Sequence, residues 1–205
     1  MVLRWLRSSR EALALLVAVL LVGAAVVVSQ HAAANEPGPT AKPSAVVAVS
    51  SSDRGAAARW WREAGIPGAV LVVPPASAPQ CGSRTSAPGA GEDAIAEAVA
   101  CSAGNPDRAV TASLRAAADD ARATGAPLVL LGEGWLAAPP VPVQGPGDVS
   151  DVQRSISAAT VAGVIPPLNG TSVVLIGPAP DSGVKQTWDA YLAAAGAAEV
   201  RWVTV

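Results

Sequence analysis

The stretch "VVLIGPAPDSGVKQTWDAYLAAAGAAEV", residues 173–200, decides the fold. It opens with a short apolar run and a turn rich in Gly and Pro. Apolar residues at helical spacing follow, namely Val184, Trp188, Tyr191, Leu192 and Ala195. The stretch ends where another β-branched run begins. A strand, a helix and a second strand in this order predict a βαβ unit with parallel strands.

The same alternation continues upstream of this unit. Short apolar runs predict strands at residues 44–50, 68–75, 126–134, 171–178 and 198–205. Amphipathic stretches predict helices at residues 54–65, 92–103, 105–125, 148–164 and 182–196. Strands that are apolar throughout indicate a sheet covered on both faces. The predicted fold is therefore α/β, a doubly wound, mostly parallel sheet in a three-layer sandwich.

Loops and helix ends follow from local signals. A Gly/Ser/Pro-rich loop is expected before the helix at 92–103, and the prolines of residues 135–147 indicate a second loop. Asp53 is expected to cap the first helix, and Gly65 to end it. Asn105 is the expected cap of the third helix. On the fourth helix the residues expected to face inward are Val149, Val152, Ile156 and Ala159.

Composition narrows the class of protein. The chain has 205 residues, no Phe and one His, and its net charge is −2. Removing the first 34 residues takes away three Arg and one Glu, which leaves −4 by side-chain count. Without a basic patch, nucleic-acid binding is not expected. A serine nucleophile would lack a base because the single His31 lies near the N-terminus, so we do not expect an enzyme.

The N-terminus predicts a place in the cell. Arg4, Arg7 and Arg10 precede residues 12–29, which carry no charge and would span about 27 Å as a helix. This charge pattern predicts a single-pass anchor with a cytoplasmic N-terminus. Residues 1–30 then form the cytoplasmic tip and transmembrane anchor, 31–44 a Pro-rich spacer, and 45–205 an extracytoplasmic domain. The alternative is cleavage after Ala34, which would release a secreted protein.

Cys81 and Cys101 are the only cysteines, and both lie in the part predicted to be exported. An oxidising compartment favours a disulfide between them, with two free thiols as the alternative. No cofactor is expected, because a two-Cys metal site would lack further ligands.

Ligands of doubly wound sheets bind beyond the carboxyl ends of the strands. The residues there that form a possible ligand face are Asp53, Arg54, Trp135 and Asp181. Trp135 is the candidate for an exposed contact, although a tryptophan packed on loop prolines is an equal alternative. Asp181 is also a natural cap for the last helix.

The order of elements resembles a known family. The stretches "NPDRAVTASLRAAADDARATGAPLVLLGEG", "VIPPLNGTSVVLIGPAPDSG" and "WDAYLAAAGAAEV" resemble the von Willebrand factor type A-like domains of membrane-anchored actinobacterial proteins. The resemblance covers residues 45–205 and implies a Rossmann-like domain that contacts a protein partner.

Many members of that family bind a divalent metal through a D-x-S-x-S motif, a Thr and a later Asp. Here the corresponding positions are Ser50, Ser52 and Arg54, and Glu133 is the candidate for the later acid. The resemblance therefore implies a degenerate site without metal. Arg54 is expected to pair with Glu133 or Asp53 in place of the ion.

Two partner classes follow. The first hypothesis is a membrane-anchored binding or scaffold module that contacts an envelope protein. The alternative is a cell-wall module, because "PDSG" at residues 180–183 is similar to a turn of OmpA-like peptidoglycan-binding domains. There an Asp and an Arg hold diaminopimelate, and here Asp181 would be joined by Lys185. An exported hydrolase is a third alternative.

Overall fold

The computed structural model describes residues 42–102, 110–137, 140–141 and 149–205. Residues 42–205 form one compact unit. The predicted anchor at residues 12–29, the spacer up to residue 41 and the expected cap Asn105 lie outside the described residues. Within the described ranges, no helix is long and apolar enough to cross a membrane.

Strands and helices alternate along the domain as the sequence predicts. The strands are β1 Ala45–Val49, β2 Val70–Val73, β3 Arg84–Thr85, β4 Leu128–Leu131, β5 Ser172–Gly177 and β6 Glu199–Thr204. The helices are α2 Arg54–Ala64, η1 Pro79–Cys81 (a 3-10 turn), α3 Gly91–Cys101, α4 Val110–Thr124, α5 Glu133–Leu136, α6 Val149–Val161 and α7 Ser182–Ala194.

The six strands form one sheet in the order β3-β2-β1-β4-β5-β6. All neighbours are parallel except β2 and β3. This is the strand order of a Rossmann-like doubly wound sheet. The strand β3 corrects the prediction of a loop in this region. It forms because Val70 and Ser86 exchange hydrogen bonds, which align residues 84–85 antiparallel to β2.

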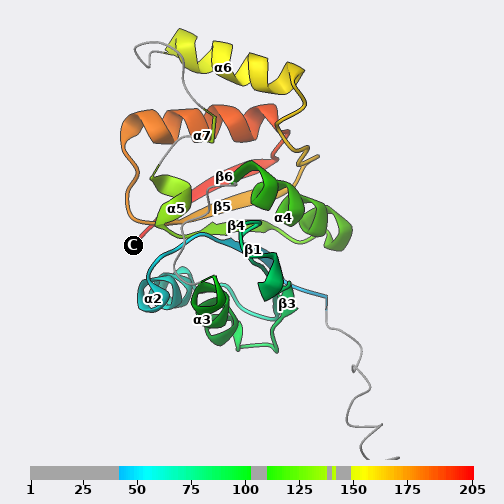
Figure 1. Cartoon of the computed structure of the whole chain (residues 1–205), viewed down its shortest axis with the longest axis vertical. Coiled ribbons are helices and arrows are strands. Elements are labelled where there is room, and N and C mark those ends of the chain that lie inside the picture. The colour runs from blue at the N-terminus through cyan, green and yellow to red at the C-terminus, as the bar shows by residue number, and fades with distance from the viewer. Residues whose placement is uncertain (1–41, 103–109, 138–139, 142–148) are drawn as a thin grey trace, which may run out of the picture. The chain divides into compact units, whose positions relative to one another are not determined.

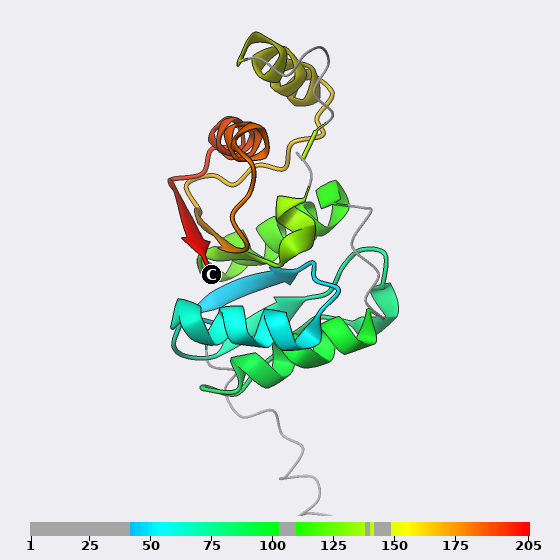
Figure 2. The ribbon, with the colours of Figure 1, turned by 90° about the vertical axis from the view of Figure 1, so that its left-hand side faces the viewer.

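Side chains alternate between two cores, one on each face of the sheet. Val46, Ala48, Leu128 and Leu130 face the core beneath α4, α5 and α7, whereas Val47 faces the core beneath α2 and α3. Figures 1 and 2 show α2 and α3 on one side of the sheet and the other helices on the opposite side. The three-layer arrangement predicted from buried, parallel strands is therefore confirmed.

Helix α6 lies outside the three layers. It packs on α7 rather than on the sheet, so it is the outermost helix in Figure 1. Val152, Ile156 and Ala159 face the core as predicted. The prediction for Val149 is wrong, because its side chain is 60% exposed. It occupies the first position of a helix that has only one packed side.

The segment after β4 is shorter as a strand than predicted. Strand β4 ends at Leu131, and Glu133–Leu136 form the short helix α5. Gly132 has a φ of 124°, a conformation that favours glycine and turns the chain out of the sheet direction. Trp135 and Leu136, expected in a loop, are therefore helical and buried.

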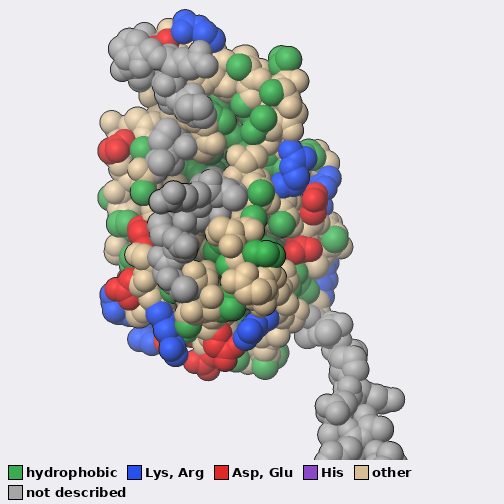
Figure 3. All heavy atoms as spheres, in the orientation of Figure 1, with side chains coloured by type: hydrophobic (Ala, Val, Ile, Leu, Met, Phe, Trp, Pro, Cys, Tyr) green, Lys and Arg blue, Asp and Glu red, His purple; other side chains and the backbone are tan. Residues whose placement is uncertain are grey.

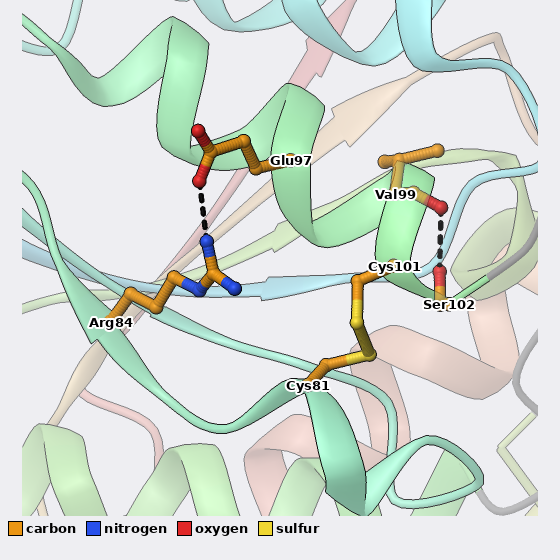
Figure 4. Close-up of a disulfide and its surroundings, with 6 residues drawn as sticks. All are labelled: Cys81, Arg84, Glu97, Val99, Cys101 and Ser102. Carbon is orange, nitrogen blue, oxygen red and sulfur yellow. Dashed lines mark hydrogen bonds and ion pairs between the residues drawn. A yellow bond between two sulfur atoms is a disulfide. The ribbon is translucent and has the colours of Figure 1, made fainter.

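The predicted disulfide is confirmed. Cys81 and Cys101 are joined, with a Cα–Cα distance of 5.8 Å. Figure 4 shows the bond linking the turn η1 to the end of α3. In the same region Arg84 of β3 forms an ion pair with Glu97 of α3. The closed segment therefore holds the edge strand β3 against the helix layer.

Candidate functional site

The loops that follow β1 and β4 meet at the carboxyl edge of the sheet. These strands are neighbours, and the direction of winding reverses between them. In doubly wound sheets this is the usual ligand crevice. Here the Ser50 N–H donates to Leu131 O (2.9 Å), and the Gly134 N–H donates to Ser50 O (2.8 Å). The two loops are therefore hydrogen-bonded to each other.

Glu133 closes the crevice between these loops. Its Oε1 accepts hydrogen bonds from the Ser52 N–H (2.5 Å) and the Ser52 hydroxyl (2.6 Å). A side chain at Gly132 or Gly134 would collide with Ser50, so both glycines are needed for this close approach. The structure thus brings the predicted positions Ser50, Ser52 and Glu133 together, and the protein's own carboxylate occupies the crevice.

Hydrogen bonding controls the charge of Glu133. Partial burial raises the pKa of its carboxyl group, but hydrogen bonds from the Ser52 N–H, the Ser52 hydroxyl and the Ser51 hydroxyl act in the opposite direction and prevail. The net effect is a pKa below the usual range of a glutamate. Glu133 is therefore charged at neutral pH and holds α5 to the loop after β1.

The donor set at this edge does not fit a hard divalent cation. Ser50 Oγ and Glu133 Oε2 are buried and have no hydrogen-bond partner in the described part of the chain. The Ser51 and Ser52 hydroxyls beside them already take part in hydrogen bonds. Mg²⁺ requires near-octahedral oxygen ligands. Residues 42–102, 110–137 and 149–205 contain no group of three His, Cys, Asp or Glu that could hold a metal.

Arg54 does not take the place of an ion. The expected pairing with Glu133 or Asp53 is wrong, because Arg54 is exposed and forms no ion pair with any described residue. Glu133 faces Ser52 instead. Asp53 caps α2 as predicted, accepting from Gly55 N (2.8 Å) and Ala56 N (3.0 Å). The carboxylate of Asp53, with which Arg54 was expected to pair, therefore already accepts hydrogen bonds from backbone N–H groups.

Trp135 is not an exposed contact residue. Its side chain is 0% exposed, and its indole N–H donates to Ala48 O on β1 (3.1 Å). The ring meets Trp188 of α7 edge to face. Of the two alternatives that the sequence offered, an exposed contact and a packed side chain, the packed one is observed, because α5 turns Trp135 inward. Of the four residues of the predicted ligand face, Asp53, Arg54 and Asp181 are exposed.

Asp181 and Lys185 each have partners within the domain. Asp181 caps α7 by accepting from Val184 N (2.9 Å), as the sequence predicts. Lys185 Nζ forms an ion pair with Asp189 (2.6 Å) and lies 5.0 Å from the centre of the Trp202 ring. The arrangement therefore does not direct the two side chains at a common ligand, as the cell-wall hypothesis requires.

An open hollow that the sequence did not indicate lies at the opposite, amino edge of the sheet. Its volume is about 600 Å³. Its walls are the end of α4 with the turn into β4 and the turn before β5, namely Ala121, Arg122, Gly125, Ala126, Pro127, Asn169, Gly170, Thr171 and Ser172. Arg122 is paired with Asp119, and the Thr171 hydroxyl donates to Leu168 O. The hollow is separate from the predicted ligand face.

The surface charges are mixed. Figure 3 shows acidic and basic side chains next to one another on its lower part, over α2 and α3. Arg62 of α2 and Glu92 of α3 form one such pair. Interleaved charges of both signs suit a protein surface better than the phosphate backbone of a nucleic acid.

The chain matches no protein-family model, no curated protein and no solved structure at a significant level.

Proposed function

We propose that the chain is a membrane-anchored, extracytoplasmic binding or scaffold module of the bacterial envelope. In this proposal the carboxyl edge of its sheet contacts an envelope protein without a bridging metal. The observation that carries it is the closure of the crevice between β1 and β4 by Glu133 and Ser52. A closed crevice favours contact through the exposed surface over capture of a small ligand.

The ends of the helices support the same function. The N-termini of α2 and α7 point to this edge and would attract anions. Each is already capped by a carboxylate, Asp53 and Asp181 respectively. These caps disfavour a phosphate group at either helix. The exposed Arg54, next to the first of these caps, remains available to an acidic group of a protein partner.

The direction of the strands also favours the carboxyl edge as the surface that contacts a partner. The spacer ends at Ser44, just before the amino end of β1. Because β1, β2, β4, β5 and β6 are parallel, their carboxyl ends all lie at the edge away from that junction. The carboxyl edge is therefore clear of the segment by which the chain enters the domain.

Site-specific photocrosslinking in cells tests the proposal. A photoreactive residue replaces Arg54 or Ser182 at the carboxyl edge, and exposed Ala123 at the amino end of the sheet serves as the matched control. We expect a discrete protein adduct from the first two positions, resistant to EDTA, and none from Ala123. Equal adducts from all three positions, or loss with EDTA, would contradict the proposal. So would co-sedimentation of the unmodified protein with purified cell wall in place of a protein adduct.

A further inference from the structure

The strand β6 is an open edge of the sheet. It stands at one end of the strand order, and β5 is its neighbour on one side. Figure 2 shows this strand beside the C-terminus. An edge strand presents unpaired backbone N–H and C=O groups that can pair with another strand. At the other end of the sheet, β3 is only two residues long and is tied to α3.

The two faces of β6 differ. Val200 and Trp202 pack toward α7, and the Trp202 indole donates to Asp189 (2.8 Å). Alternate residues therefore point to the opposite face, on which α2 packs under β4 and β5. On that face Glu199 and Arg201 are exposed. One acid and one base thus lie two residues apart on an uncovered surface.

This spacing is self-complementary. If two copies of β6 pair antiparallel around a two-fold axis at Val200, Glu199 of each copy lies opposite Arg201 of the other. Two cross-strand ion pairs result, and opposite charges in such positions stabilise a sheet. A two-fold axis at Arg201 would bring two guanidinium groups together. An axis at Trp202 would place Arg201 opposite Val203. Charge therefore selects the register centred on Val200.

We propose that β6 is a self-association surface through which a second copy of this chain extends the sheet in this register. The contact is separate from the carboxyl edge, and its confinement to one membrane rests on the anchor of the function proposed above. Within β6, residues 199–201 of each copy face one another in this register, so the interface is small. Confinement of both copies to one membrane would raise their effective concentration and favour pairing.

Cysteine crosslinking of the full chain in membranes tests the proposal. The two native cysteines are joined, so an introduced cysteine is the one free thiol. At Val200, on the axis, the two Cα atoms would be about 4.5–5.5 Å apart, within the range of a disulfide. At Thr204, the matched control on the same strand, they would be about 26 Å apart. We expect Val200→Cys, and not Thr204→Cys, to yield a species of twice the 20.3 kDa chain mass.

A charge exchange provides the second test. Arg201→Glu in the Val200→Cys background should reduce the crosslinked fraction about tenfold, because like charges then face each other twice. Adding Glu199→Arg should restore it. Both side chains are exposed, so the variants should keep the thermal midpoint of the parent. Equal crosslinking at Val200 and Thr204, no rescue by the double exchange, or an adduct to a different protein would overturn the proposal. None of these results would affect the photocrosslinking at Arg54.

Discussion

The indole N–H of Trp188 donates a 2.7 Å hydrogen bond to the carbonyl oxygen of Trp135. The two rings lie edge to face, with centroids 6.2 Å apart. Because Trp135 donates in turn to Ala48 O, these contacts connect α7 through α5 to β1. They hold α5 over the carboxyl edge and so position Glu133 against Ser52.

Trp188→Phe should weaken this connection. The substitution leaves a buried carbonyl oxygen without its donor, which costs roughly 1–3 kcal/mol of the free energy of unfolding. The control is Trp60→Phe, since Trp60 is half-buried and its indole has no hydrogen-bond partner among the described residues. That change should stay within about 0.5 kcal/mol. Urea unfolding measures both, and equal losses would argue against a special role for the Trp188–Trp135 bond.

Because of the Glu133–Ser52 contact, the free energy of unfolding should decrease as the solution becomes acidic. The pKa of Glu133 is lower in the folded state than in the unfolded state. Its contribution to the free energy of unfolding is therefore present above the usual pKa range of a glutamate and is lost as the pH falls through the folded-state pKa. Glu133→Gln should therefore destabilise at neutral pH and differ little from the parent at about pH 3. Denaturant midpoints at both pH values are the measurement, with the exposed Glu199→Gln as control. A loss for Glu133→Gln that is the same at both pH values would show that the charge is irrelevant.

Tyr191 should make stability fall at alkaline pH. Burial raises the pKa of its phenol to about 12, although the charge of Arg115 acts in the opposite direction. Because the pKa of Tyr191 is higher in the folded state than in the unfolded state, the stabilisation linked to this phenol is complete below about pH 10. It is lost as the pH rises from about 10 to 12. The chain has a single Tyr, and its six Trp do not titrate in this range, so the near-ultraviolet absorbance change on tyrosinate formation reports this group alone.

Tyr191→Phe is the matched variant for this effect. Tyr191 OH has no hydrogen-bond partner in the described part of the chain, so its removal should cost no more than about 0.5 kcal/mol at neutral pH. It should also remove the alkaline loss of stability. A tyrosinate transition near pH 10 in the folded protein would contradict the burial of this side chain.

The disulfide should contribute substantially to stability. It joins residues 20 positions apart, and a loop of that size corresponds to about 3 kcal/mol in the chain-entropy model. Replacing both cysteines by Ser should lower the thermal midpoint by about 10 °C in a domain of this size. Calorimetry of the oxidised protein and the double variant measures the change. An unchanged midpoint would mean that contacts such as Arg84–Glu97 already hold this segment.

Divalent metal should leave the thermal midpoint unchanged. The carboxyl edge offers one carboxylate, and Ser52 already satisfies part of it. Thermal unfolding with and without millimolar Mg²⁺, Mn²⁺ or Ca²⁺ provides the test, with Glu133→Ala as the control. A saturable rise of several degrees that this variant abolishes would show a working metal site.

Local signals predicted the elements correctly where the cause lies within a few residues. Asp53 and Asp181 cap helices because their carboxylates reach N–H groups two or three positions ahead. Apolar runs without polar breaks predicted parallel strands, because only a sheet covered on both faces buries every side chain. With two cysteines in the whole chain, one intramolecular pairing was possible.

The candidate site depended on contacts that the sequence does not encode locally. Glu133 and Ser52 are 81 positions apart, and their contact requires β1 and β4 to be neighbours and Gly132 to turn the chain. The same turn buried Trp135, and the caps at the helix N-termini left Arg54 without a carboxylate. Sequence determined which segments become strands, helices and caps, because short-range hydrogen bonding and apolar periodicity decide these. The family resemblance grouped Ser50, Ser52 and Glu133, but only tertiary packing decided which side chains bond to one another at the carboxyl edge, because distant loops come together there once the sheet has formed.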